Sequence, residues 1–185
     1  MMDILTPKGR ETIKQEREAI SLFLDAFYDY GFFETPKDRP ADIDGIITHN
    51  GTLISGVEVK CRMMTYEELM GPFKGRWLVT QDKIDRGISL CRGLGIDFRG
   101  FLYLVPDKML VIVPIWSYDR GLLADIELAQ TETQATVNGG VALRLNAYID
   151  ITKAKRLERI DTTEKQEAYG KGAGTWVLHL PEPGG

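Results

Sequence analysis

Two neighbouring segments decide the fold, Asp42-Ile43-Asp44-Gly45-Ile46-Ile47 and Val57-Glu58-Val59-Lys60-Cys61-Arg62. The pair Asn50-Gly51 lies between them and is typical of a tight hairpin turn. Side chains alternate across a sheet, so the charged residues of the second segment share one face and its apolar residues share the other. The sequence therefore predicts a hairpin whose apolar face packs on a helix while its charged face lines a cleft.

The connection between the two strands decides whether Asp44 and Glu58 share a face. A plain two-residue turn sets Asp44 opposite Val57, on the face away from Glu58. A connection with an odd number of residues, or a bulge in one strand, brings the two carboxylates together. We therefore predict one of three devices: a three-residue loop with Gly51 left-handed, a bulge at Gly45, or a bulge at Gly56.

These segments resemble the PD-(D/E)xK superfamily, the restriction-endonuclease-like nucleases, in which an Asp on one strand is followed by Glu- or Asp-x-Lys on the next. Here Asp44 precedes Glu58-Val59-Lys60. The resemblance covers about residues 15–105 and implies an α/β fold, with a central mixed β-sheet flanked by helices in the order αβββαβ. We expect a single nuclease-like domain over residues 1–185, with its core at about 6–115 and a β-rich C-terminal extension at about 116–185.

The resemblance also implies a catalytic site that binds Mg²⁺, with Mn²⁺ as a substitute. The metal ligands would be the carboxylates of Asp44 and Glu58 and the backbone carbonyl of Val59. Lys60 would orient the attacking water or help to deprotonate it. Asp42 lies on the same strand face as Asp44 and could replace it as a ligand.

Two predicted helices supply further candidates. In the first, from about residue 6 to 30, Glu16 lies about 40° from Ile20 on the apolar stripe, where an acid is costly unless it has a partner or a metal. Relatives often carry a glutamate on this helix that joins the metal site, and Glu16 matches it; the alternative is a solvated carboxylate at the end of the stripe. The second helix runs from Gln81 to about Leu94, and its start resembles the polar position, here Gln81 or Lys83, that relatives place near the cleft. The alternative is a Gln81 that contacts the backbone or is solvated.

The remaining pattern predicts strands over residues 101–105, 109–113 and 141–151 and a helix over 118–130. A basic group follows the last strand. It could contact phosphates or be the solvated face of a helix. Its members are Lys153, Lys155, Arg156 and Arg159.

Composition narrows the class of protein. The formal net charge of −4 argues against a general nucleic-acid coat protein, although a nuclease can combine an acidic site with a local basic rim. Two histidines and two cysteines supply few ligands for zinc or for a disulfide framework. The first residues lack the pattern of a secretory signal and no apolar run is long enough to span a bilayer, so we expect a cytoplasmic protein with no membrane partner.

The resulting hypothesis is a metal-dependent nuclease that hydrolyses DNA phosphodiester bonds, directed by structure or by ends, as an exonuclease, resolvase or repair enzyme. Many relatives act as dimers, so a homodimer is possible. Two alternatives remain open: a catalytically inactive nuclease-fold subunit that binds nucleic acid within a larger complex, and an unrelated α/β structural or assembly protein whose hairpin mimics the motif.

Overall fold

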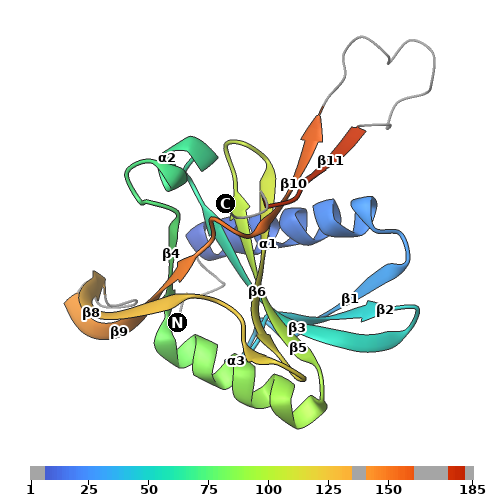
Figure 1. Ribbon diagram of the computed structural model, residues 1–185, viewed down its shortest axis with the longest axis horizontal. Coiled ribbons are helices and arrows are strands. Elements are labelled where there is room, and N and C mark those ends of the chain that lie inside the picture. Colours follow the sequence, from blue (N-terminus) through green and yellow to red (C-terminus); the bar gives the residue numbers. More distant parts are fainter. Residues whose placement is uncertain (1–6, 135–140, 161–174, 182–185) are drawn as a thin grey trace.

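The computed structural model describes residues 7–134, 141–160 and 175–181, and shows a mixed α/β arrangement around a curled central sheet (Figure 1). In chain order the elements are α1 (Pro7–Ala26), β1 (Tyr30–Glu34), β2 (Gly45–His49), β3 (Thr52–Arg62), α2 (Tyr66–Met70), β4 (Arg76–Thr80), α3 (Gln81–Leu94), β5 (Asp97–Leu104), β6 (Met109–Ser117), β7 (Gly121–Leu122), β8 (Ile126–Gln134), β9 (Val141–Asp150), β10 (Lys155–Ile160) and β11 (Thr175–His179).

The central sheet is mixed, as predicted. Its strands follow the order β1-β2-β3-β5-β6-β10-β11, and the short β7 pairs with β6. Strands β3 and β5 run parallel, and α3 lies in the connection between them, whereas the other pairs of this sheet are antiparallel. A second sheet of three strands has the order β4-β9-β8.

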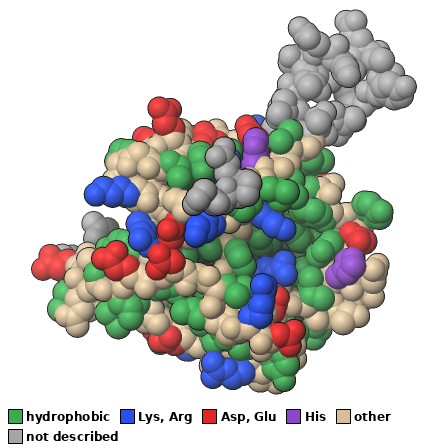
Figure 2. Space-filling model, viewed as in Figure 1, with side chains coloured by type: hydrophobic (Ala, Val, Ile, Leu, Met, Phe, Trp, Pro, Cys, Tyr) green, Lys and Arg blue, Asp and Glu red, His purple; other side chains and the backbone are tan. Residues whose placement is uncertain are grey.

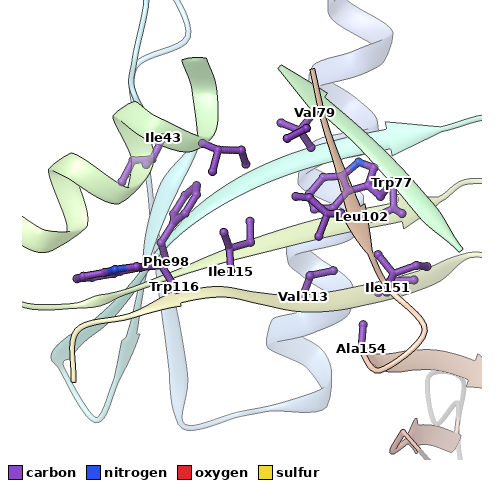
Figure 3. Close-up of a cluster of buried hydrophobic side chains, with 14 of the residues drawn as sticks. Ile43, Trp77, Val79, Phe98, Leu102, Val113, Ile115, Trp116, Ile151 and Ala154 are labelled. Atoms are coloured by element: carbon purple, nitrogen blue, oxygen red, sulfur yellow. The ribbon is translucent and has the colours of Figure 1, made fainter. Parts of the chain in front are cut away.

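Two hydrophobic clusters lie on opposite faces of the central sheet. The apolar side of α1, including Phe23, packs with Val57 and Val59 of β3 on one face. On the other face, α3 and the second sheet cover a cluster that includes Trp77 and Leu102 (Figure 3). Strand β3 therefore has α1 on one side and α3 with β4 on the other, and the predicted alternation of its apolar and charged residues is confirmed.

The hairpin brings Asp44 next to Glu58 through a bulge. Its turn has two residues, Asn50 and Gly51, both with positive φ (49° and 78°), as a tight hairpin turn requires. The register then shifts: Ile47 pairs with Ser55 but Thr48 pairs with Leu53, which leaves Ile54 as the additional residue of β3. Gly45 consequently pairs with Val57, and Asp44 follows as the neighbour of Glu58.

The predicted bulge is therefore confirmed, but it lies at Ile54 rather than at Gly45 or Gly56. Both glycines serve close packing instead. A Cβ atom at Gly45 would lie 2.1 Å from the ring of Phe32, and one at Gly56 would lie 2.4 Å from Cys91 Sγ. Isoleucine at position 54 is a common strand residue, so the sequence does not indicate the position of the bulge.

Three sequence-based expectations for the elements are wrong. The first helix ends at Ala26 rather than near Tyr30. The helix expected over 118–130 is replaced by β7 and β8, because β8 pairs with β9 along its whole length. The basic group, for which a helix face was one of two interpretations, lies partly on β10, an internal strand of the central sheet, so the helix interpretation is wrong.

The surface has no single sign of charge on the face drawn in Figure 2, where acidic and basic side chains of the described residues are interspersed. None of the described helices is both long and apolar enough to cross a bilayer.

Candidate active site

The candidate site forms where β3 continues beyond the end of β2. Strand β2 begins at Gly45, opposite Val57, so the next residues of β3 have no strand partner on that side. The carboxylate of Asp44 takes the vacant position: its Oδ2 accepts a hydrogen bond from the backbone N–H of Val59 at 2.8 Å. The carbonyl of Val59 points to the same side as its N–H and accepts from Lys60 Nζ at 3.3 Å.

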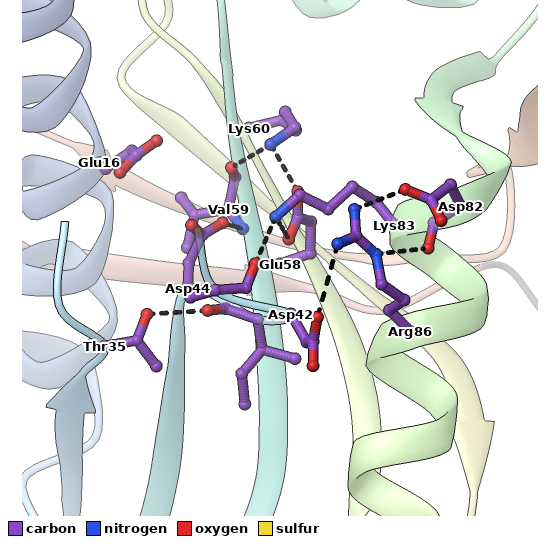
Figure 4. A network of polar contacts seen from close by, with 12 residues as sticks. Glu16, Thr35, Asp42, Asp44, Glu58, Val59, Lys60, Asp82, Lys83 and Arg86 are labelled. Carbon is purple, nitrogen blue, oxygen red and sulfur yellow. Dashed lines mark hydrogen bonds and ion pairs between the residues drawn. The ribbon is translucent and has the colours of Figure 1, made fainter. Parts of the chain in front are cut away.

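Glu58 is the deepest charged side chain of the site, with none of its surface exposed. Its Oε1 accepts a hydrogen bond from Lys60 Nζ at 2.6 Å. Its Oε2 has no hydrogen-bond partner and lies 3.7 Å from Lys83 Nζ. Figure 4 shows Lys60 and Lys83 approaching Glu58 from β3 and from α3.

Glu16 reaches the site from α1, on the side opposite Glu58 (Figure 4). We call the space between the side chains of Glu16, Asp44 and Glu58 the gap. A lysine that sequence reasoning missed joins it to the strands. Lys37 Nζ lies 2.9 Å from Glu16 Oε2 and 3.1 Å from Asp44 Oδ1. These three residues and Val59 are among those that line a cavity of about 110 Å³.

Burial and charge act in opposite directions on the three carboxylates. Burial opposes the charge of Asp44, but Lys60, Lys37 and the N–H of Val59 together outweigh it and hold its pKa below the usual value. Burial raises the pKa of Glu58, and the charge of Asp44 raises it further, against the pull of Lys60 and Lys83. Burial and Asp44 likewise raise the pKa of Glu16 despite the contact with Lys37. Asp44 is therefore the most firmly ionised acid of the three.

The two lysines held by these acids stay charged. Burial tends to lower the pKa of Lys60, yet Glu58 and Asp44 raise it above the usual value. Burial acts in the same way on Lys37, and Asp44 and Glu16 again outweigh it. The positive charges of Lys37 and Lys60 thus lie among the three acids of the gap.

The other predicted residues lie elsewhere. Asp42 is about half exposed and pairs with Arg86 at 3.7 Å, so the geometry favours Asp44 over Asp42 as the acid beside Glu58. Gln81 donates to Asp85 at 2.7 Å and lines a separate groove with Trp116 and Leu128. At the start of α3, Lys83 is the residue that faces Glu58, so the structure does not bring Gln81 to the carboxylates.

The donor atoms of the gap suit a hard divalent cation. Carboxylate and carbonyl oxygens are the ligands that Mg²⁺ and Mn²⁺ take in proteins. Buried Glu58 Oε2, without a hydrogen bond, is an oxygen whose bonding a cation would complete. Within residues 7–134, 141–160 and 175–181, no three His, Cys, Asp or Glu side chains form a ready-made metal site. Two carboxylates and the Val59 carbonyl would therefore need water or substrate oxygens to complete the coordination.

Comparisons with known proteins add little to this geometry. No protein-family model matches the chain, and no curated protein matches it in sequence. Among solved structures, a Holliday junction resolvase, Hjc, from Archaeoglobus fulgidus is similar with a TM-score of 0.40 and 19% sequence identity, over 54% of this chain and 74% of that one. So slight a likeness supports no conclusion about function, which is therefore inferred from the site itself.

Proposed function

We propose that the chain is a metal-dependent nuclease that hydrolyses DNA phosphodiester bonds, with Asp44, Glu58 and Lys60 as its catalytic residues. One observation carries the proposal. The bulge at Ile54 sets Asp44 beside Glu58, where a buried carboxylate oxygen has no hydrogen-bond partner and an ammonium group lies alongside. A buried carboxylate that lacks hydrogen bonds or counter-charges lowers the stability of a fold. Such groups cluster at functional sites.

The residues of the gap match the needs of phosphodiester hydrolysis. Asp44, Glu58 and the Val59 carbonyl would hold Mg²⁺ or Mn²⁺, and Glu16, at the far side of the gap, would accept a hydrogen bond from a metal-bound water or act as a further ligand. A cation held there would offset the negative charge of the phosphate and lower the pKa of a bound water. The low pKa of Asp44 keeps this ligand ionised throughout the neutral range.

Lys60 has a more specific role in this proposal than the sequence alone implies. Glu58 and Asp44 raise the pKa of its ammonium, and in this role the charged group would balance negative charge and orient the attacking water. Glu58 holds this ammonium at 2.6 Å and thereby fixes its direction toward the gap.

A cleavage assay tests the proposal. Single-stranded, double-stranded and branched DNA would be incubated with the protein and Mg²⁺ or Mn²⁺, with a chelator as the negative control. We expect cleavage that needs the metal, and a loss of about 100-fold or more in the Lys60→Ala variant, the usual effect of removing a catalytic side chain. Lys108→Ala is the matched control, because Lys108 is exposed in the turn between β5 and β6.

The results also separate the alternatives. Cleavage by Lys60→Ala at the wild-type rate would show that the site is wrongly assigned. Binding of DNA without cleavage under any of these conditions would favour the inactive nuclease-fold subunit. An absence of both binding and cleavage would favour an unrelated α/β protein.

A further inference from the structure

Lys37 is the lysine of the gap whose ammonium contacts two acids from distant parts of the chain. Its ammonium lies between two carboxylates from different parts of the fold, Glu16 of α1 and Asp44 immediately before β2. Its side chain is about four-fifths buried. It belongs to the loop between β1 and β2, which is residues 35–44. A single positive charge thus stands between two acids that would otherwise repel each other.

The loop that carries Lys37 is fastened at several other points. Thr35 Oγ1 donates to the carbonyl of Ile43 at 2.8 Å, within the loop. On the α3 side, Lys83 donates to the carbonyl of Ala41 at 2.9 Å and Arg86 pairs with Asp42. The backbone of the loop is therefore held without Lys37, and its long side chain can leave the acids by rotating about its own bonds.

We infer that the Lys37 ammonium is an internal counter-cation that holds Glu16 and Asp44 while no divalent cation is bound and gives way when one binds. This inference rests on the proposed function, since it concerns the same metal. The ammonium lies 3.1 Å from Asp44 Oδ1, so a cation bound to Asp44 would meet a like charge at short range. The ammonium and the metal therefore compete for the same carboxylates.

Lys60 differs from Lys37 in this respect. It projects from β3 and is paired with Glu58, the neighbour on its own strand face. Lys37 instead joins α1 to the end of its own loop, and its two partners lie 21 and 7 positions away in the sequence. Lys37 is thus the lysine whose departure would leave both acids open to a metal while Lys60 remains in place.

Titration with Mn²⁺ in a calorimeter tests this inference through binding instead of activity. We expect Lys37→Met to bind Mn²⁺ on the order of tenfold more tightly than the wild type, because a nearby positive charge has been removed. Lys14→Met is the matched control: it makes the same change of side chain and net charge at an exposed position of α1, and its affinity should stay at the wild-type value. Lys37→Gln provides a second variant if Lys37→Met does not fold.

A second measurement uses the wild-type protein alone. Reductive methylation with formaldehyde, read residue by residue by mass spectrometry, reports how accessible each lysine amine is. We expect Mn²⁺ to increase methylation of Lys37 severalfold while that of Lys14 stays constant.

The outcomes distinguish this inference from the proposed function. Equal or weaker Mn²⁺ binding by the Lys37 variants, or unchanged methylation of Lys37 in the presence of bound Mn²⁺, would overturn the role of Lys37 and leave the metal site in place. No Mn²⁺ binding by the wild type or by any variant would overturn both proposals.

Discussion

At the scale of single residues, Glu58 is an acid whose burial opposes its charge. Its surface is fully buried, one of its oxygens has no hydrogen bond, and its pKa is raised by burial and by Asp44. A raised pKa means that Glu58 is harder to ionise in the folded protein than in the unfolded chain, which opposes folding at pH values above the ordinary glutamate pKa. The site therefore holds a residue that is retained at a cost in stability, as proteins often do at functional positions.

Glu58→Gln should consequently stabilise the metal-free protein at pH 7 by about 1 kcal/mol, a common size for a single substitution. The native state binds the Glu58 proton more tightly than the unfolded state, so the cost of Glu58 grows as pH rises through its raised pKa. The advantage of the variant should thus be full above that pKa and vanish toward the ordinary glutamate pKa, about 4.3.

Chemical denaturation across pH, in the presence of a chelator, measures this difference. Glu127→Gln is the control, because Glu127 is an exposed glutamate of β8 and its replacement should change stability little at any pH. A Glu58→Gln protein less stable than the wild type at pH 7 would mean that the pairing with Lys60 outweighs the cost of burial.

The residues of the site differ in how well their positions could be predicted from the residues near them in the sequence. Glu58 and Lys60 lie on β3 and Asp44 immediately precedes β2, so alternation and the turn could predict their meeting once a bulge was allowed. Glu16 was predicted from its place on the helix stripe, and its contact with Lys37 shows that it does face the gap. Lys37 gave no signal, because its contacts depend on the path of a ten-residue loop of mixed composition between β1 and β2.

At the scale of elements, helix α3 shows how packing can outweigh helical propensity. Gly87 lies in its middle, buried against the ring of Phe98, where an added Cβ would come within 2.4 Å of the ring. Gly93 lies in its last turn, and an added Cβ would meet nothing within 4 Å. The same substitution should therefore have opposite effects at two positions of one helix.

We expect Gly87→Ala to destabilise the protein by about 1–2 kcal/mol, since the overpacking exceeds the gain in helix propensity. Gly93→Ala should stabilise it by about 0.5 kcal/mol, because alanine restricts the unfolded chain and favours the helix. Urea denaturation of both variants checks this pair. Stabilisation by Gly87→Ala would show that α3 can move away from β5 at little cost.

Prediction from sequence was least successful for the segment after residue 117. Its apolar residues, Leu122, Leu123 and Ile126, are compatible with a helix, yet the segment forms strands. The pairing of β8 with β9, from Ile126 with Ile149 to Gln134 with Val141, supplies hydrogen bonds that local propensity does not foresee. In contrast, the bounds of α3 were predicted closely, because its repeating apolar positions are a local feature.

At the scale of the whole molecule, burial is unevenly distributed between the two sheets. In β5 the residues Phe101 to Leu104 are fully buried, between the cluster under α1 and the cluster under α3. The far end of the second sheet is different: Leu128, Leu143 and Leu145 are exposed. The single domain and the homodimer that the sequence predicts both remain predictions.

Amide hydrogen exchange, followed by mass spectrometry, should therefore find the slowest exchange in β5 and much faster exchange in β8 and the first half of β9. Strands buried on both faces open only with the whole fold, whereas exposed pairs open locally. Equally slow exchange in both regions would show that a partner, such as a second copy of the chain, covers the exposed leucines. Repeating the measurement at tenfold dilution would reveal such a partner, since protection by association falls with concentration.

The bulge residue of β3, Ile54, limits how the length of this hairpin can change among related chains. One insertion or one deletion between Gly45 and Val57 would turn Asp44 away from Glu58, whereas a change of two residues would restore their common side. Under the proposed nuclease function, related chains that keep Asp44 beside Glu58 should therefore differ in the length of this hairpin by even numbers, and a homologue whose length differs by an odd number should lack either the aspartate or the proposed activity.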